Sequence, residues 1–340
     1  MLNPNASPAP LAYNQLQELV KQQNHYATNA NLGFSLPTLP QGLTSDKCLI
    51  WEGKPGLDLN RPALLSWRHP LNPDYEVQPI IRKGGNIMFY GPPKSRKTYA
   101  MDAMMTCFTT PGNPALNMGW IAGEYAYKDG WKGMRFDTEM PEEEVLERLQ
   151  GFAGWTGMRS HIKDADTLKE IYPWYGLKGY PPDVCRSLII DALEKAKKRD
   201  FFPSIIIIDQ AVDLSFGYDQ SHANEVIGFF NYINREYGCS IATTMHANRD
   251  GKEPSGSFGS HMMRKMDAVI HVCKQDDGTS KVTPKIMRKL KDDFYYIFAQ
   301  TKKSPVLVYC DVIKQQFIPM SGLASDTVSK KQEFDPNTFY

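Results

Sequence analysis

Short apolar runs alternate with helical patterns along most of this chain, and that alternation restricts its fold more than any other feature. The apolar runs, which we expect to be strands, lie at 87–90, 119–122, 134–137, 205–209, 240–245, 268–273 and 305–312. Helical patterns lie between several of them, at 98–108, 141–152, 182–198 and 224–237. Alternating strands and helices favour an α/β fold, with a central, mostly parallel sheet flanked by helices. The run at 205–209 is too apolar for a half-exposed strand, so we expect it to be central.

The charge balance limits how this chain can meet nucleic acid. Of its 340 residues, 39 are Lys or Arg and 38 are Asp or Glu, which gives a formal net charge of +1. This balance excludes a protein that coats nucleic acid through bulk positive charge, and equally an acidic disordered chain. Contact with nucleic acid must therefore come from a local patch or from a ring of subunits.

Composition also divides the chain into segments. Residues 1–45 are rich in Asn, Gln, Pro and Ala and predict a flexible arm that docks on another subunit. The core is expected at 46–320, with a lead-in at 46–83 and a polar tail at 321–340. The six cysteines include no C-x-x-C pair, so a zinc site is not indicated and reduced, packed thiols are expected. No secretory signal pattern or membrane-length apolar run is visible, which predicts a cytoplasmic protein without membrane contact.

The strongest local motif is G-P-P-K-S-R-K-T at 91–98, between an expected strand and an expected helix. It matches the phosphate-loop pattern G-x-x-x-x-G-K-[ST] at every position but one. In such loops, backbone N–H groups surround phosphate oxygens, the lysine (Lys97) reaches the terminal phosphates, and the hydroxyl (Thr98) binds Mg²⁺. The sequence therefore predicts ATP and Mg²⁺ as cofactors. The expected nucleotide-binding residues are Gly91, Pro92, Pro93, Lys94, Ser95, Arg96, Lys97, Thr98 and Tyr99.

One position departs from the pattern, because Arg96 stands where the second glycine is expected. Glycine adopts the backbone conformation of that position without steric strain, whereas a residue with a side chain does so at a cost of about 1 kcal/mol or more. Two interpretations remain open. Arg96 either adds a positive charge toward the phosphates or marks a site that hydrolyses poorly.

Three further strand ends carry polar residues with a chemical use. Glu139 follows the strand at 134–137 and is suited to orient and deprotonate an attacking water, although acidic residues here also suit the start of a helix. Asp209 ends the run of four isoleucines and is expected to bind Mg²⁺ beside Thr98. His246 ends the strand at 240–245 and is placed either to sense the γ-phosphate or simply to cap the loop. The Gly- and Ser-rich residues 250–263 predict a mobile loop.

Taken together, these motifs resemble the RecA-like ATPases of the replicative-helicase branch, both DnaB-like and the shorter RepA-like hexameric helicases. The matching features are the loop G-P-P-K-S, the segment F-D-T-E-M-P at 136–141, Asp209-Gln210, Met245-His246, and Gly259-Ser260 followed by Asp267-Ala268. The resemblance covers about 84 to 300, which is most of the chain.

The resemblance implies a RecA-like P-loop core that hydrolyses ATP between the subunits of a hexameric ring, with single-stranded DNA in the central channel. Glu139, Lys97 and His246 take the catalytic positions. The basic stretch Arg288, Lys289 and Lys291 supplies candidates for a finger that acts on a neighbour's ATP, or is only a solvated basic stretch. The DNA-facing loops carry Arg249 and Lys252, with Phe216, Tyr218 and Phe258 available to stack on bases.

The function expected from this resemblance is a DNA helicase or translocase that replicates a phage, plasmid or other mobile element. Two alternatives remain at this stage. One is a RecA-like ATPase that is not a helicase, either recombinase-like or regulatory. The other is an ATP-binding scaffold with weak hydrolysis, of which Arg96 would be the mark.

Overall fold

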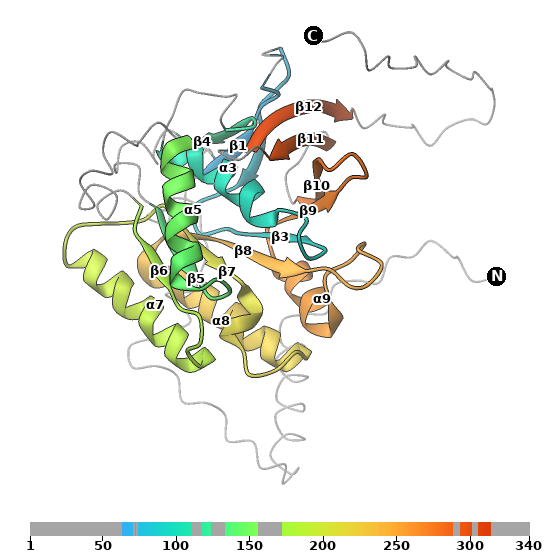
Figure 1. The fold of residues 1–340 in the computed structure, drawn as a ribbon. Coiled ribbons are helices and arrows are strands. Elements are labelled where there is room, and N and C mark those ends of the chain that lie inside the picture. The colour runs from blue at the N-terminus through green and yellow to red at the C-terminus, as the bar shows by residue number, and fades with distance from the viewer. Residues whose placement is uncertain are drawn as a thin grey trace, which may run out of the picture. The chain divides into compact units, whose positions relative to one another are not determined.

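The computed structural model describes residues 63–70, 72, 74–109, 117–123, 133–155, 172–287, 293–300 and 305–313. A nine-stranded sheet runs through this part of the chain, in the order β12-β11-β10-β9-β3-β8-β7-β5-β6 (Figure 1). Its strands are β3 (Asn86–Gly91), β5 (Gly133–Asp137), β6 (Trp174–Gly176), β7 (Ile205–Asp209), β8 (Ser240–His246), β9 (Ala268–Lys274), β10 (Ser280–Met287), β11 (Asp293–Gln300) and β12 (Pro305–Ile313).

The sheet has a parallel part and an antiparallel part. Neighbours from β9 to β6 pair in parallel, and β9, β10, β11 and β12 pair in antiparallel fashion. The predicted fold class, a mostly parallel sheet flanked by helices, is confirmed. The expected central position of the isoleucine run is also confirmed, because β7 pairs with β8 on one side and β5 on the other.

The helices lie on both faces of the sheet (Figure 1). One face is covered by α3 (Lys97–Thr109) and α5 (Glu142–Trp155). The other is covered by α7 (Pro182–Lys197), α8 (Gln220–Tyr237) and α9 (Gly256–Lys265). Side chains of β7 alternate between these layers: Ile205 and Ile207 face the α3 side, whereas Ile206 and Ile208 face the α7 side. Burial on both faces explains why this strand carries four isoleucines in succession.

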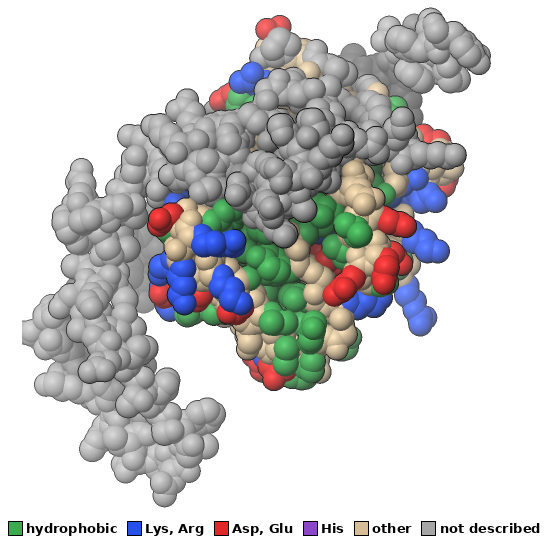
Figure 2. Space-filling model, turned by 60° about the vertical axis from the view of Figure 1, so that its left-hand side comes forward, with side chains coloured by type: hydrophobic (Ala, Val, Ile, Leu, Met, Phe, Trp, Pro, Cys, Tyr) green, Lys and Arg blue, Asp and Glu red, His purple; other side chains and the backbone are tan. Residues whose placement is uncertain are grey.

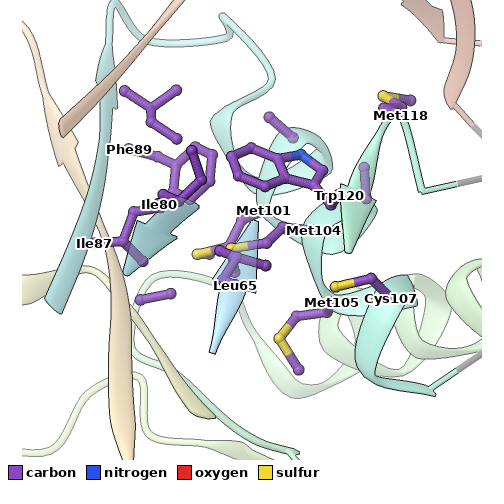
Figure 3. Packing of buried hydrophobic residues seen from close by; sticks show 14 of the residues in the cluster. Leu65, Ile80, Ile87, Phe89, Met101, Met104, Met105, Cys107, Met118 and Trp120 are labelled. Carbon is purple, nitrogen blue, oxygen red and sulfur yellow. The ribbon is translucent and has the colours of Figure 1, made fainter. Parts of the chain in front are cut away.

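A small second sheet packs on the α3 face. It has the order β2-β1-β4, from β2 (Gln78–Ile81), β1 (Leu65–Trp67) and β4 (Trp120–Ala122), and both pairings are antiparallel. Figure 3 shows Leu65 and Trp120 of this sheet packing with Phe89 of β3 and the methionines of α3. The run at 119–122 is thus a strand as expected, but it belongs to this sheet rather than to the parallel one.

Both ends of α8 follow ordinary capping rules. Asp219 caps α8 by accepting the N–H of His222 at 3.0 Å, and Gly238 ends that helix with a left-handed φ of 65°. The first turn of α5 carries three glutamates, Glu142, Glu143 and Glu144, whereas the first turn of α3 carries no acidic residue. The positive end of the α3 dipole is therefore not neutralised by its own side chains.

Several predictions fall on other parts of the chain. The expected arm at 1–45 and tail at 321–340 lie outside the described residues, so these boundaries stay predictions. Four of the described cysteines, Cys107, Cys185, Cys239 and Cys310, are buried thiols outside any disulfide, as expected. Among the helices described, none combines the length and apolar character needed to cross a bilayer.

Candidate functional site: the loop between β3 and α3

The chain passes from β3 to α3 through a loop with two left-handed residues, Lys94 at φ 61° and Arg96 at φ 68°. Gly91 lies at the start of this loop, where β9 approaches so closely that a Cβ on Gly91 would be 2.0 Å from the carbonyl oxygen of Val272. The loop ends at the N-terminus of α3, whose first turn carries no acidic residue. The backbone of this segment is thus arranged as the sequence motif predicts, with helix N–H groups available to an anion.

Arg96 takes the positive φ that the missing glycine would take. Its Nη1 donates to the carbonyl oxygen of Gly278 at 2.6 Å, in the turn between β9 and β10. This hydrogen bond ties the loop to the neighbouring hairpin. The structure therefore gives Arg96 a structural contact, in addition to the two interpretations that the sequence left open.

Lys97 is almost fully buried at the first position of α3. Its Nζ donates to the carbonyl oxygens of Gly91 and Pro92, at 3.2 Å each. Burial lowers the pKa of Lys97, opposed by the negative charges of Asp209 and Glu139. The hydroxyl of Ser95, also buried, finds no hydrogen-bond partner among the residues that the structure describes. A cation and an unpaired buried hydroxyl beside a helix N-terminus fit the phosphates of a nucleotide.

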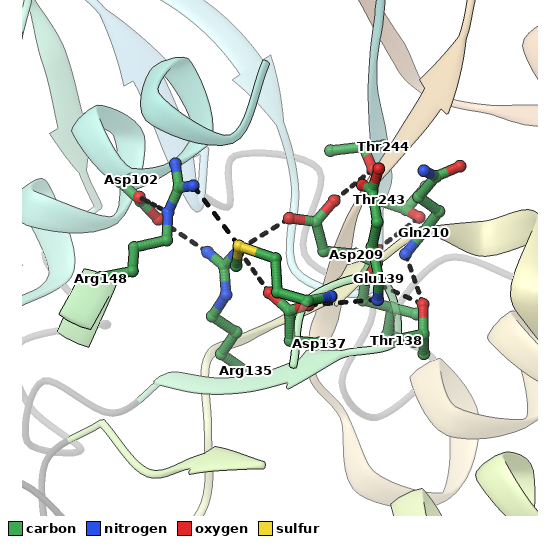
Figure 4. Close-up of polar contacts among 12 residues, drawn as sticks. Asp102, Arg135, Asp137, Thr138, Glu139, Arg148, Asp209, Gln210, Thr243 and Thr244 are labelled. Atoms are coloured by element: carbon green, nitrogen blue, oxygen red, sulfur yellow. Dashed lines mark hydrogen bonds and ion pairs between the residues drawn. The ribbon is translucent and has the colours of Figure 1, made fainter. Parts of the chain in front are cut away.

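Asp209, the expected Mg²⁺ ligand, is buried at the end of β7 (Figure 4). Its Oδ1 accepts from the Thr244 hydroxyl of β8, and its Oδ2 accepts from Arg135 Nη2 of β5 at 2.7 Å. A carboxylate has about four acceptor sites, so water-mediated Mg²⁺ binding remains open to it. Thr98, the other expected ligand, is the second residue of α3 and directly follows Lys97, as the motif requires.

Glu139 lies just after β5, with its side chain about half exposed. Its backbone N–H and that of Met140 donate to Asp137 Oδ1, at 3.2 Å and 2.9 Å. Burial raises the pKa of Asp137, and the Arg135 charge opposes this. Asp137 thus shapes the turn that carries Glu139, while the Glu139 carboxylate stays free to face a ligand.

His246 lies between the phosphate loop and the ends of β5 and β7. Its Nδ1 is 3.4 Å from Lys97 Nζ, its Nε2 is 2.9 Å from Gln210 Nε2, and Glu139 Oε1 is 3.9 Å from Nε2. Burial and the Lys97 charge lower the pKa of His246, which favours the neutral ring. A neutral ring has one accepting nitrogen, so the tautomer decides whether His246 accepts from Lys97 at Nδ1 or from the Gln210 amide N–H at Nε2.

Gln210, the first residue after β7, connects His246 to the turn that follows β5. Its N–H donates to Thr138 Oγ1 at 2.8 Å, and Thr138 Oγ1 also lies 2.7 Å from Asp213 Oδ2. Burial raises the pKa of Asp213. The structure thus brings together Lys97, Glu139, Asp209 and His246, which the sequence placed in one site.

The loops after β7 and β8 differ from expectation in part. Phe258 is buried in the α7-face core, so the prediction that it stacks on a base is wrong. Residues 256–265 form α9 rather than a mobile loop, because Phe258 and Met262 anchor one face of that helix. Phe216 and Tyr218 are exposed, as the prediction requires, and Arg249 and Lys252 are exposed on the loop after β8.

Two further predictions concern the basic stretch after β10 and Tyr99. The finger candidates Arg288, Lys289 and Lys291 lie outside the described residues. The ring of Tyr99 packs against the core, and Arg148 Cζ lies 4.3 Å from the centre of that ring. The expected contact of Tyr99 with the cofactor stays a prediction.

Arg135, Asp102 and Thr138 were not assigned a role from the sequence. The sequence could have indicated the importance of Arg135, since it is a lone charge inside the apolar run M-R-F of an expected strand. Such a residue must find buried partners of opposite charge. Asp102 and Thr138 carried no comparable signal, because polar residues are common on helices and after strands.

A separate hollow of about 820 Å³ lies at the β6 edge of the sheet. Its lining residues are Phe136, Trp174, Tyr175, Gly176, Leu177, Tyr180, Leu188, Asp191, Ala192, Lys195, Lys198 and Arg199. Figure 2 shows hydrophobic side chains beside a group of Lys and Arg residues on this side of the molecule. Because β8, β7 and β5 lie between β6 and β3, the hollow is distinct from the phosphate loop.

Comparison with known proteins agrees with this geometry at the level of the family. No curated protein matches the chain significantly. Residues 62–252, more than half of the chain, match the AAA_25 family of AAA domains, a span that runs from before β1 to the loop after β8. The chain therefore belongs to this family of P-loop ATPase domains, whose members generally bind ATP with Mg²⁺.

Proposed function

We propose that this protein is an ATP-driven DNA helicase or translocase that works as a homo-oligomeric, hexameric ring around single-stranded DNA, in the replication of a phage, plasmid or other mobile element. The observation that carries the proposal is the position of two loops. The loop after β7 presents exposed Phe216 and Tyr218, and the loop after β8 presents exposed Arg249 and Lys252. Both loops continue strands whose ends, Asp209 and His246, belong to the nucleotide site.

In this proposal, Lys97 binds the terminal phosphates, and the first turn of α3 and the Ser95 hydroxyl bind phosphate oxygens. Mg²⁺, held by Thr98 and through water by Asp209, neutralises charge on the β- and γ-phosphates. Glu139 orients the attacking water and takes its proton.

Coupling to DNA follows from the contacts around His246. The imidazole ring of His246 lies between Lys97 and Gln210. The backbone carbonyl of His246 accepts the N–H of Ser255, which lies at the far end of the loop after β8. The Tyr90 hydroxyl, at the end of β3, donates to the Lys252 carbonyl at 2.8 Å. When the γ-phosphate leaves Lys97, the contact of Lys97 with His246 changes. That change reaches the loop after β8, because the loop is bonded to both His246 and Tyr90. Aromatic stacking and a few cations per subunit, summed over a ring, suffice for binding to single-stranded DNA.

The deciding experiment measures ATP hydrolysis by the full chain with and without single-stranded DNA, together with its mass by light scattering. A helicase ring shows DNA-stimulated hydrolysis, a hexameric mass and strand displacement on a forked duplex. Hydrolysis without DNA stimulation indicates a regulatory ATPase of the same fold. Nucleotide binding with almost no turnover indicates the scaffold alternative.

A further inference from the structure

Arg135 occupies an unusual place for a cation. Its guanidinium is completely buried on β5, and it contacts three carboxylates from three elements (Figure 4). Nη1 is 2.7 Å from Asp102 Oδ1 of α3, and Nη2 is 2.7 Å from Asp209 Oδ2 and 3.2 Å from Asp137 Oδ2. Burial opposes its charge, but three carboxylates around one guanidinium stabilise it strongly.

Two of the three partners of Arg135 lie on the elements that carry the expected Mg²⁺ ligands. Asp209 is the expected Mg²⁺ ligand, and Asp102 lies on α3 one helical turn after Thr98, so it faces the same side of the helix. Without a cation among them, three buried carboxylates would repel one another and attract a divalent ion. Arg135 supplies that cation permanently.

A second arginine shares the network without touching Asp209. Arg148 of α5 donates from Nε to Asp102 Oδ2 at 3.0 Å, and its guanidinium lies over Tyr99. The two arginines and three aspartates leave a formal charge of −1 on the group. Within the described residues, no group of three or more His, Cys, Asp or Glu side chains is arranged to hold a metal by itself.

We propose that Arg135 is the internal counter-ion of Asp209, and that it makes metal binding by this protein depend on nucleotide. Asp209 accepts from Arg135 and from Thr244, which leaves about two of its four acceptor sites for a metal or the water around it. Water-mediated binding through its remaining acceptor sites holds a metal only when nucleotide phosphates supply the other ligands. Arg135 is thus a positioning residue that acts through Asp209. This inference rests on the proposed ATP hydrolysis.

The test measures Mn²⁺ binding to the full chain by electron paramagnetic resonance, with and without ADP. We expect the wild type to bind Mn²⁺ with ADP and very weakly without it. Arg135→Gln should bind Mn²⁺ alone at least about tenfold more tightly than the wild type, because the carboxylates lose their counter-ion. Arg135→Lys should restore the dependence on ADP in large part, because it restores the charge.

Arg148→Gln is the matched control. It removes a cation from the same network but leaves the contact of Arg135 with Asp209, so Mn²⁺ binding should remain dependent on ADP. Equal tightening in Arg148→Gln and Arg135→Gln would overturn the proposal, since net charge alone would then explain it. Unchanged Mn²⁺ binding in Arg135→Gln would overturn it as well.

A second variant decides the matter if Arg135→Gln does not fold. Asp102→Asn keeps the shape of the side chain but gives Arg135 one carboxylate fewer, so its charge acts more strongly on Asp209. Mn²⁺ binding in the presence of ADP should weaken about tenfold, and an unchanged affinity would refute the proposal. A wild type that fails to bind ADP would end the proposed function, while the comparison in Mn²⁺ alone would still decide the role of Arg135.

Discussion

Lys97 Nζ lies 3.4 Å from His246 Nδ1, and this contact joins the start of α3 to the end of β8. The opposite ring nitrogen of His246 lies 2.9 Å from Gln210 Nε2, and Gln210 directly follows Asp209, the proposed metal ligand. The proposed phosphate-binding lysine and the strand end that leads to a proposed DNA loop are thus separated by one imidazole. Its protonation state affects both.

His246 gives the fold a dependence on pH. Burial and Lys97 lower its pKa in the folded state, whereas a histidine in the unfolded chain titrates near 6.5. Below about pH 6.5 the unfolded state binds more protons, so stability falls as the pH is lowered through the folded pKa. We expect the wild type to lose more stability than His246→Gln between about pH 7 and pH 5, measured by urea unfolding.

Lys97→Met provides the companion measurement, because it removes the charge that helps to lower this pKa. The loss of stability at low pH should be smaller in this variant than in the wild type. The carboxylates near His246, namely Glu139, Asp209 and Asp213, remain in both variants and cancel in the comparison. If both variants kept the wild-type dependence on pH, His246 would not be its source.

Glycine should be tolerated in place of Arg96 better than alanine. Both variants lose the hydrogen bond to Gly278, but at φ 68° alanine also bears the steric cost of the left-handed conformation, whereas glycine adopts that φ freely. Arg96→Ala should therefore be less stable than Arg96→Gly by about 1 kcal/mol. Chemical unfolding of the two variants checks this difference, and ATP titration should find binding retained in Arg96→Gly. Equal stability of the two would show that the loop relaxes out of the positive φ.

Glu139→Gln should stop turnover without preventing nucleotide binding. The side chain is half exposed and faces His246 at 3.9 Å, so its replacement disturbs little of the fold. If it is the general base, ATP hydrolysis falls by about 10²–10⁴-fold while ATP affinity changes little. Glu143→Gln, in the first turn of α5, is the control and should hydrolyse ATP as the wild type does. Equal rates in both variants would favour the simple helix-start interpretation of Glu139.

The sequence predicted the parallel part of the sheet because burial on both faces produces continuous apolar runs. The runs at β3, β7, β8 and β9 and the helix α3 appear in the structure at nearly the expected residues. The antiparallel strands β10 and β11 were not predicted. The segment S-K-V-T-P-K-I-M of β10 mixes charges with apolar residues because one of its sides is partly exposed. It also contains a proline, which lies at the register shift between Pro284 and Ile286.

The site was predicted to the extent that single motifs mark it. Lys97, Asp209 and His246 end or follow buried elements, so their shared location follows from parallel topology. The hydrogen bonds around these residues could not be predicted from the topology alone. Gln210 and Thr138, for example, come into contact only because β5 pairs with β7 in this register. Phe258 was misplaced for a related reason: a Gly- and Ser-rich segment looks like a loop until a helix packs it against the core.

The exposed aromatic pair after β7 offers the sharpest test of DNA binding. Phe216 and Tyr218 are 64% and 75% exposed, and Tyr218 is fixed by its backbone, whose carbonyl accepts the N–H of Phe258 at 3.2 Å. Side-chain removal therefore leaves the loop anchored. Phe216→Ala or Tyr218→Ala should weaken binding to single-stranded DNA by about 5- to 100-fold each, as expected for the loss of one stacked base.

Tyr180→Ala is the matched control for this pair, because Tyr180 is an aromatic residue of similar exposure, 54%, in the hollow beside β6. It should bind single-stranded DNA as the wild type does, measured by fluorescence anisotropy with a labelled oligonucleotide. The ATP affinity of all three variants should be unchanged, since none of these side chains contacts the phosphate loop. DNA affinity that falls equally in all three would point to general surface adsorption, and affinity that falls only in Tyr180→Ala would move the DNA path to the β6 edge.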